Sequence, residues 1–162
     1  MTLDTDSLTD VSVAELRHAE QLATLINDAF RIAEGSFIDQ ERIDVAEVRR
    51  LFQKGLFLII EDNESLIGSV YLERREDRTY LGLLSVEPSK QGLGLGSKLM
   101  IAGEQHARFT GSHYMDILIV NLREELPAFY KKRGYVKTGT SPFQENVNLK
   151  RPCHFIHMSK VL

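Results

Sequence analysis

The chain has 162 residues, of which 43% are hydrophobic and 27% are charged, so it fits one globular domain and excludes a disordered or fibrous protein. Twenty Lys and Arg residues against 23 Asp and Glu residues give a net charge of -3, which provides no overall positive field for binding nucleic acid or an anionic membrane. No apolar run approaches the roughly 20 residues of a membrane span, and the acidic beginning of the chain does not resemble a signal peptide. We therefore expect a cytoplasmic protein, whose single cysteine, Cys153, excludes an internal disulfide bond.

The N-terminal part predicts a loose segment followed by a helix. Residues 1–10 are acidic and rich in Thr, Ser and Asp, so we expect them to be flexible and to precede one domain over residues 11–162. Apolar residues at helical spacing predict a helix over about residues 16–33. The sequence does not determine where this helix begins, because Val11 and Val13 alternate as in a short first strand.

A second helix and three strands are predicted next. After a loop over residues 35–42, Asp44 and Glu47 have the spacing of a helix start, and Gly55 would end that helix. Apolar runs and β-favouring residues then predict antiparallel strands joined by polar turns. The strands are expected over residues 56–61, 65–73 and 79–86, with turns at 62–64 and 74–78.

The second half of the chain alternates helices and strands. Pro127 is tolerated only near the first turn of a helix, and Gly134 is typical of a helix end. The helices are expected over residues 97–109 and 123–133, and the strands over residues 115–120, 135–140 and 154–161. The chain order is therefore two helices, three strands, a helix, a strand, a helix and two strands.

A glycine-rich segment connects the third strand to the following helix. Backbone amides at the start of a helix point outward unpaired and favour an anion, and glycine lets a phosphate group approach the backbone. Two common nucleotide-binding patterns do not fit, because Ser97 stands where each of them requires a glycine. Alone, the glycines favour a simple tight turn into the helix. The segment reads Gln91-Gly92-Leu93-Gly94-Leu95-Gly96.

Two blocks of the chain together form a more specific pattern. The first is Gln91-x-x-Gly94-x-Gly96, directly after a predicted strand. The second is Asn121 at the end of the next strand, followed by residues 129–135 with the sequence Phe-Tyr-Lys-Lys-Arg-Gly-Tyr. With the upstream hairpin and the same order of elements, these blocks resemble the GNAT superfamily of acetyl-CoA-dependent N-acetyltransferases over nearly the whole chain.

The resemblance implies an α+β fold in a single domain. It predicts a central mixed, mostly antiparallel sheet of six to seven strands, flanked by about four helices. The sheet is expected to be splayed at the acetyl-CoA site, where the strand over residues 79–86 parts from the strand over residues 115–120. The pantetheine arm of acetyl-CoA would insert between these two strands.

The resemblance also implies direct transfer of the acetyl group from acetyl-CoA to a primary amine of a small molecule or peptide, without a covalent enzyme intermediate. The backbone N–H of Val86 is a candidate to polarise the thioester carbonyl. Tyr130 is the candidate catalytic general acid, because a phenol is protonated at neutral pH and can donate to the leaving sulfur. Lys131 or Lys132 would lie near the adenosine phosphates. The implied cofactor-binding residues are Leu84, Ser85, Val86, Gln91, Gly92, Leu93, Gly94, Leu95, Gly96, Ser97, Asn121 and Tyr130.

The general base is not identified by the resemblance. Members of the family often have Glu or His on the strand before the glycine loop, and this chain has Tyr80 and Gly82 at those places. Glu73, Glu34 and Asp39 are the alternative bases, acting directly or through water, although charged residues at such places commonly lie on the surface.

The acceptor amine is expected to contact residues 31–42 and 141–154. Acidic residues in the first segment would attract a cation, which suits a small amine, a polyamine or a protein lysine equally well. No metal is expected, because His154 and His157 would lie on opposite faces of the last strand.

Three alternatives stay open. The missing family base would also suit a non-catalytic acyl-CoA-binding sensor or interaction module with the same fold. The donor could be a longer acyl group. The exposed edges of the last strands could pair in a homodimer.

Overall fold

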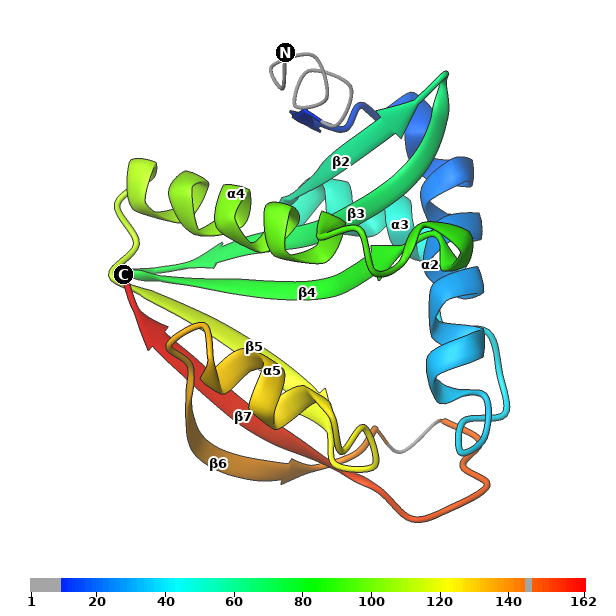
Figure 1. The fold of residues 1–162 in the computed structure, drawn as a ribbon, viewed down its shortest axis with the longest axis vertical. Helices are drawn as coiled ribbons and strands as arrows, with labels where there is room; N and C mark the ends of the chain where they lie inside the picture. Colours follow the sequence, from blue (N-terminus) through cyan, green and yellow to red (C-terminus); the bar gives the residue numbers. More distant parts are fainter. Residues whose placement is uncertain (1–9, 145–146) are drawn as a thin grey trace.

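Within residues 10–144 and 147–162, which the computed structural model describes, seven strands form one sheet in the order β1-β2-β3-β4-β5-β7-β6 (Figure 1). Only β4 and β5 pair in parallel, and all other neighbours are antiparallel. The predicted mixed, mostly antiparallel α+β fold is therefore confirmed. The strands are β1 (Val11–Val13), β2 (Leu56–Asp62), β3 (Ser65–Arg75), β4 (Arg78–Val86), β5 (Tyr114–Val120), β6 (Val136–Pro142) and β7 (His154–Val161).

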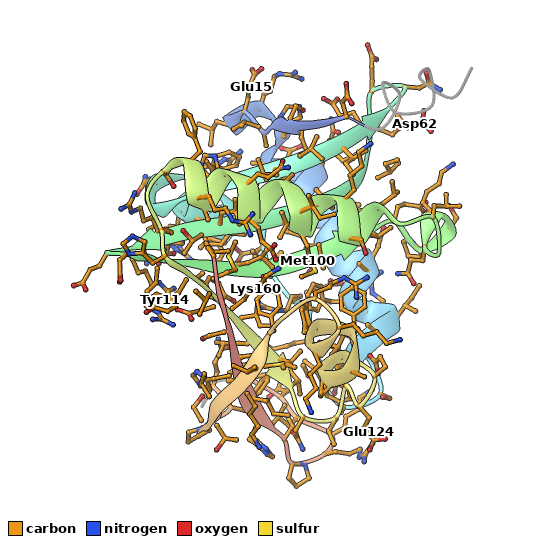
Figure 2. The ribbon with its side chains drawn as sticks, turned by 60° about the vertical axis from the view of Figure 1, so that its left-hand side comes forward. Glu15, Asp62, Met100, Tyr114, Glu124 and Lys160 are labelled. Carbon is orange, nitrogen blue, oxygen red and sulfur yellow. The ribbon has the colours of Figure 1, made fainter. Side chains whose placement is uncertain are left out.

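Four α-helices in the described residues cover the two faces of the sheet. They are α2 (Ala19–Glu34), α3 (Val45–Lys54), α4 (Leu95–Phe109) and α5 (Leu126–Lys131). Figure 2 shows α4 lying across the front of the upper strands, with α2 behind them. None of the helices in the described part of the chain is long and apolar enough to cross a membrane.

The alternation of side chains along the strands divides the core into two layers. Val70 in β3 joins the layer under α4, where Leu99 and Met100 are almost fully buried. The next residue, Tyr71, faces the opposite layer, against α2 and α3. Because both faces of β3 are covered, this strand is buried at every position from residue 66 to residue 72.

The two halves of the sheet separate between β4 and β5. These strands pair only over residues 78–80 and 114–116, and Figure 1 shows them diverging from there toward α2. A bulge in β4 lies beyond this point, where Leu83 has a positive φ of 54° and its carbonyl accepts a hydrogen bond from Ser85 Oγ. A non-glycine residue in this conformation is strained, and the bulge bends β4 at the opening.

Several element boundaries differ from the sequence predictions, and three of the differences change the course of the chain. Val11–Val13 is a strand, and α2 begins only at Ala19, after a 3-10 turn. The turn predicted over residues 74–78 is shorter, because the β3–β4 ladder continues to Arg75 and Arg78. The helix predicted over residues 123–133 was too long: α5 covers six residues, because Pro127 can occupy only its first turn. The predicted flexible segment lies outside the described residues except for Asp10.

Candidate active site

A cavity of about 230 Å³ lies between the diverging strands β4 and β5, and we call it the central cavity. Both parted strands, α2, α5 and the loops on either side of them contribute to its walls. Its lining residues include Phe30, Glu34, Arg42, Tyr80, Gly82, Leu84, Leu118, Arg123, Tyr130, Phe143 and Phe155. The predicted splay of the sheet is thus present, and it creates space for a molecule between the strands.

A second cavity, of about 390 Å³, lies over the glycine-rich segment, and we call it the loop cavity. It shares Phe30, Leu84 and Arg123 with the central cavity, so the two adjoin along the open edge of β4. The predicted cofactor residues in its wall are Leu84, Val86, Gln91, Gly92, Gly94, Leu95, Gly96 and Ser97. Leu93 is not among them, and its side chain is 69% exposed.

The glycine-rich segment has the backbone geometry of an anion site. Gly92 and Gly94 have φ values of 83° and 80°, a region that favours glycine, and Gly94 is the N-cap residue directly before α4. No other atom lies within 4 Å of a Cβ built at either glycine. The first N–H groups of a helix have no partner within that helix, so this loop and helix start can accept a phosphate group.

The open edge of β4 presents backbone groups to the gap. Glu87 N–H donates to the Ile67 carbonyl of β3 at 2.8 Å. Successive N–H groups of an extended strand point to opposite edges, so the Val86 N–H faces the gap. Ser85, predicted to bind cofactor, has a buried side chain that donates to the Leu83 carbonyl, and by the same alternation its N–H points toward β3, the strand with which Ser85 pairs. Its contact with a cofactor stays a prediction.

Tyr130 lies in α5 with 7% of its surface exposed and lines the central cavity. Its ring packs edge-to-face against Phe129 and Tyr135, with centroid distances of 5.1 and 5.6 Å. Its hydroxyl makes no hydrogen bond to any described residue. Burial raises the pKa of Tyr130 to about 12, which keeps the phenol protonated at neutral pH.

Arg133, which the sequence analysis did not identify as a site residue, does not line the loop cavity but contacts two residues that do, Ser97 and Phe129. Its Nη2 donates to Ser97 Oγ at 2.6 Å, and its guanidinium carbon lies 3.7 Å from the centre of the Phe129 ring. The positive charge is therefore fixed beside the first turn of α4. Lys131 and Lys132, which were the predicted phosphate contacts, are exposed.

Asn121 has a structural hydrogen bond in addition to its predicted role. Its Oδ1 accepts from the backbone N–H of His154 at 2.8 Å, and its own N–H donates to the His154 carbonyl. Asn121 is not among the residues that line either cavity. Its contact with a cofactor stays a prediction.

Glu34 is the only one of the three suggested bases that lines the central cavity. It is 6% exposed, and its Oε2 accepts from Arg123 Nη1 at 3.0 Å. Burial raises the pKa of Glu34, although the charges of Arg123 and Arg42 partly oppose this. Its second oxygen, Oε1, accepts no hydrogen bond from the described residues.

The other two suggested bases are placed differently. Glu73 accepts hydrogen bonds from Tyr71 and from Arg75, at 2.8 and 2.7 Å, and does not line the cavity. Burial would raise its pKa, but these hydrogen bonds lower it overall. Asp39 is exposed on the loop after α2, with Lys150 at 4.0 Å.

Tyr80 and Gly82, at the places where the family often has its base, form one packed unit. A Cβ at Gly82 would overlap the hydroxyl and ring of Tyr80. The Tyr80 phenol therefore occupies the space over Gly82, within the wall of the central cavity. Burial raises the pKa of Tyr80, so its hydroxyl stays protonated.

The two segments predicted to contact the acceptor lie side by side (Figure 1), and residues of both line the central cavity. Ile38 and Leu149 form an antiparallel bridge. On either side of it, Asp39 N–H donates to the Asn148 carbonyl at 2.7 Å, and Lys150 N–H donates to the Phe37 carbonyl at 2.8 Å. Residues 37–39 and 148–150, more than 100 residues apart in the sequence, are thus hydrogen-bonded to each other, and we call this pair of segments the roof of the cavity.

The described residues contain no group of three or more His, Cys, Asp or Glu side chains that could hold a metal ion. Cys153 is partly buried, and burial together with the negative charge of Glu34 raises the pKa of its thiol. A thiol with a raised pKa is a poor nucleophile at neutral pH.

The sequence model of one protein family, described as "Acetyltransferase (GNAT) domain", matches residues 18–162. No curated protein matches the chain significantly in sequence.

Several solved structures share the fold. A ribosomal-protein-alanine N-acetyltransferase from Brucella melitensis is 17% identical, with a TM-score of 0.76 over 94% of this chain and 99% of that chain. An IAA acetyltransferase from Bacillus cereus is 18% identical, with a TM-score of 0.71 over 95% and 99%. A proposed acetyltransferase from Salmonella typhimurium, solved with its cofactor acetyl-CoA, is 21% identical, with a TM-score of 0.72 over 96% and 94%.

Proposed function

Because the chain belongs to the GNAT acetyltransferase family, we propose that it transfers the acetyl group of acetyl-CoA directly to the primary amine of an acceptor molecule. One observation carries this proposal: two cavities adjoin along the open edge of β4, with the glycine loop in one and Glu34 and Tyr130 in the other. This arrangement suits a long donor that lies across both cavities and an acceptor that enters the central one.

The donor site is supported by the residues of the loop cavity and by Arg133, which contacts Ser97 in its wall. The backbone of the glycine loop and the fixed charge of Arg133 suit the phosphates of acetyl-CoA. The exposed edge of β4 at Leu84 and Val86 suits the amides of its pantetheine arm. When bound, acetyl-CoA supplies an activated acetyl group as a thioester.

Two side chains of the central cavity can move the protons that the reaction requires. Oε1 of Glu34, which is free of hydrogen bonds from the described residues, would accept a proton from the acceptor ammonium group, and its raised pKa makes it a better base. The Tyr130 hydroxyl would donate a proton to the departing sulfur. The Val86 N–H would stabilise negative charge on the carbonyl oxygen.

The proposal is tested by measuring thiol release from acetyl-CoA with amino acids, arylalkylamines, polyamines, aminoglycosides and lysine peptides as acceptors. Each acceptor is run with the wild type and with Tyr130→Phe, and acetyl-CoA binding is measured separately by calorimetry. Release with one acceptor class that is lost in the variant is the expected result. Acetyl-CoA binding without release for any acceptor would favour the non-catalytic sensor, and no binding at all would overturn the donor assignment.

A further inference from the structure

The acidic residues around the central cavity are mostly neutralised by arginines. Glu41, which lines the central cavity, accepts from Arg31 at 2.8 and 3.1 Å. Glu34 and Glu125 both accept from Arg123. The acidic character of residues 31–42, which by sequence would attract a cation, is therefore largely cancelled in the folded protein.

Arg42 is different, because it has no ion pair with any described residue. Its guanidinium carbon lies 5.5 Å from the centre of the Phe30 ring, a stacking contact that leaves its N–H donors free. Arg42 lines the central cavity and also an adjoining cavity of about 380 Å³ under the roof. A free guanidinium in a cavity wall is a binding group for a carboxylate.

The position of Arg42 relative to Glu34 sets the size of the matching ligand. Phe30 and Glu34 are four residues apart in α2, so their side chains are neighbours on one face of the helix, roughly 6 Å apart. The guanidinium carbon of Arg42 lies 5.5 Å from the centre of the Phe30 ring, and Arg42 and Glu34 line the same two cavities. The charge of Arg42 also lowers the pKa of Glu34, so the two groups are close together. A molecule that contacts both groups has its amine and its anionic group only a few bonds apart.

Resting on the proposed acetyl transfer, we propose that the acceptor is an α-amino acid, whose carboxylate binds Arg42 while its amine lies beside Oε1 of Glu34. Leu118, Phe143 and Phe155 form an apolar part of the same cavity, so the side chain of this amino acid is apolar. Phe143 and Phe155 are stacked at a centroid distance of 4.6 Å, which gives this wall a defined surface.

The first experiment compares amines with and without the carboxylate. Leucine, phenylalanine and methionine are tested against 3-methylbutylamine, 2-phenylethylamine and 3-(methylthio)propylamine, which differ from them only in that group. We expect kcat/KM for at least one amino acid to exceed that of its counterpart by about tenfold or more, since a hydrogen-bonded charge contributes this much. Equal or better turnover of the amines without a carboxylate overturns the proposal.

The second experiment changes Arg42. Arg42→Gln is expected to raise KM for the amino acid about tenfold while acetyl-CoA affinity stays unchanged, and Arg42→Lys should restore part of the affinity. The control is Arg49→Gln, an exposed arginine of α3 that does not line the cavities. An equal effect of Arg42→Gln on the amino acid and on its counterpart would contradict the role of Arg42.

Direct binding distinguishes failure of this proposal from failure of acetyl transfer. Calorimetry with the same six compounds is carried out on the wild type and on Arg42→Gln. Amino-acid binding that depends on Arg42 supports the carboxylate site even if no thiol is released. Acetylation of amines together with no preference for a carboxylate leaves the proposed function intact and rejects the amino-acid acceptor.

Discussion

Arg78 in β4 and Asp116 in β5 are joined by two hydrogen bonds of 2.7 Å at the closed end of the opening between these strands. Ser159 of β7 donates to the same carboxylate. Beyond Tyr80 the two strands no longer pair, so this bidentate ion pair lies where the halves of the sheet separate. It holds together the end from which the central cavity opens.

Loss of this contact should lower stability. We expect Arg78→Ala to reduce the free energy of unfolding by about 1–2 kcal/mol at neutral pH. The effect is moderate because the ion pair is bidentate but partly exposed to solvent. Urea unfolding measures this, and Arg50→Ala, which removes an exposed pair with Glu47 on α3, is the matched control. Equal effects of the two variants would show that the contact has no special role.

The same contact predicts a dependence on pH. Burial would raise the pKa of Asp116, but hydrogen bonds from Arg78 and Ser159 lower it overall. The folded state therefore holds this proton less tightly than the unfolded chain, and the stabilisation is present above the ordinary aspartate pKa of about 3.9. It is lost as the pH falls through the folded pKa. The stability difference between the wild type and Asp116→Asn, followed by urea unfolding, should shrink in that range.

Tyr130→Phe should lower kcat by about 100-fold or more and leave the dissociation constant of acetyl-CoA unchanged, because general acid catalysis contributes that much. The Tyr130 ring contacts remain in the variant, so its thermal stability should be close to that of the wild type. Tyr135→Phe is the control. Its hydroxyl donates to the buried Glu104 at 2.9 Å, so we expect a loss of stability without a loss of kcat. Unchanged kcat in Tyr130→Phe would remove the acid assignment.

Gly94→Val should weaken acetyl-CoA binding by about tenfold or more, measured by calorimetry. A β-branched residue at a φ of 80° is strained, and its side chain would project where the backbone should meet phosphate. Gly139→Ala is the comparison variant, since Gly139 has ordinary φ and open space around it and lies in β6. Similar affinities for the wild type and Gly94→Val would mean that the loop does not hold the donor.

The activity of the wild type should fall on the acid side with a midpoint above the ordinary glutamate pKa of about 4.3, because the pKa of Glu34 is raised. Glu34→Gln should remove this limb of the kcat/KM profile and lower kcat by about 100-fold. Glu73 does not line the cavity, so Glu73→Gln should keep the acid limb of the kcat/KM profile and the wild-type kcat. Persistence of the limb in Glu34→Gln would assign the base to another group.

The raised pKa of Glu34 also has a consequence for stability. The folded state holds its proton more tightly than the unfolded chain does. The contribution of this carboxyl group is therefore greatest below the ordinary glutamate pKa and is lost as the pH rises through the folded pKa. The stability of the wild type relative to Glu34→Gln should decline over that interval in urea unfolding.

Gly82→Ala should destabilise the protein by about 1–3 kcal/mol, because the new methyl group would overlap the Tyr80 phenol. Tyr80→Ala should remove the overlap between the new methyl group and the phenol. In the double variant the added cost of Gly82→Ala is then expected to disappear, and a double-mutant cycle in urea measures the coupling. Additive effects would show that Tyr80 does not occupy this space.

Local features of the sequence determined the backbone geometry of the glycine loop, which belongs to the proposed donor site. A run of glycines between a strand and a helix specifies its own backbone geometry, because positive φ at Gly92 and Gly94 and the start of α4 depend on adjacent residues. The order of elements and the place of Tyr130 in a helix also followed from local patterns, although that helix is shorter than predicted. These predictions required no knowledge of which distant segments pack together.

Only the tertiary structure decided the acceptor half. Glu34 and Arg123 are 89 residues apart, and nothing in the sequence near either residue specifies their contact. The same holds for Arg133 with Ser97 and for the Arg42 guanidinium that remains without an ion pair. Long charged side chains can reach many partners, so their pairing depends on how helices and loops pack on the sheet. For that reason the acidic loop that by sequence would attract a cation carries, once folded, a free positive charge at the cavity.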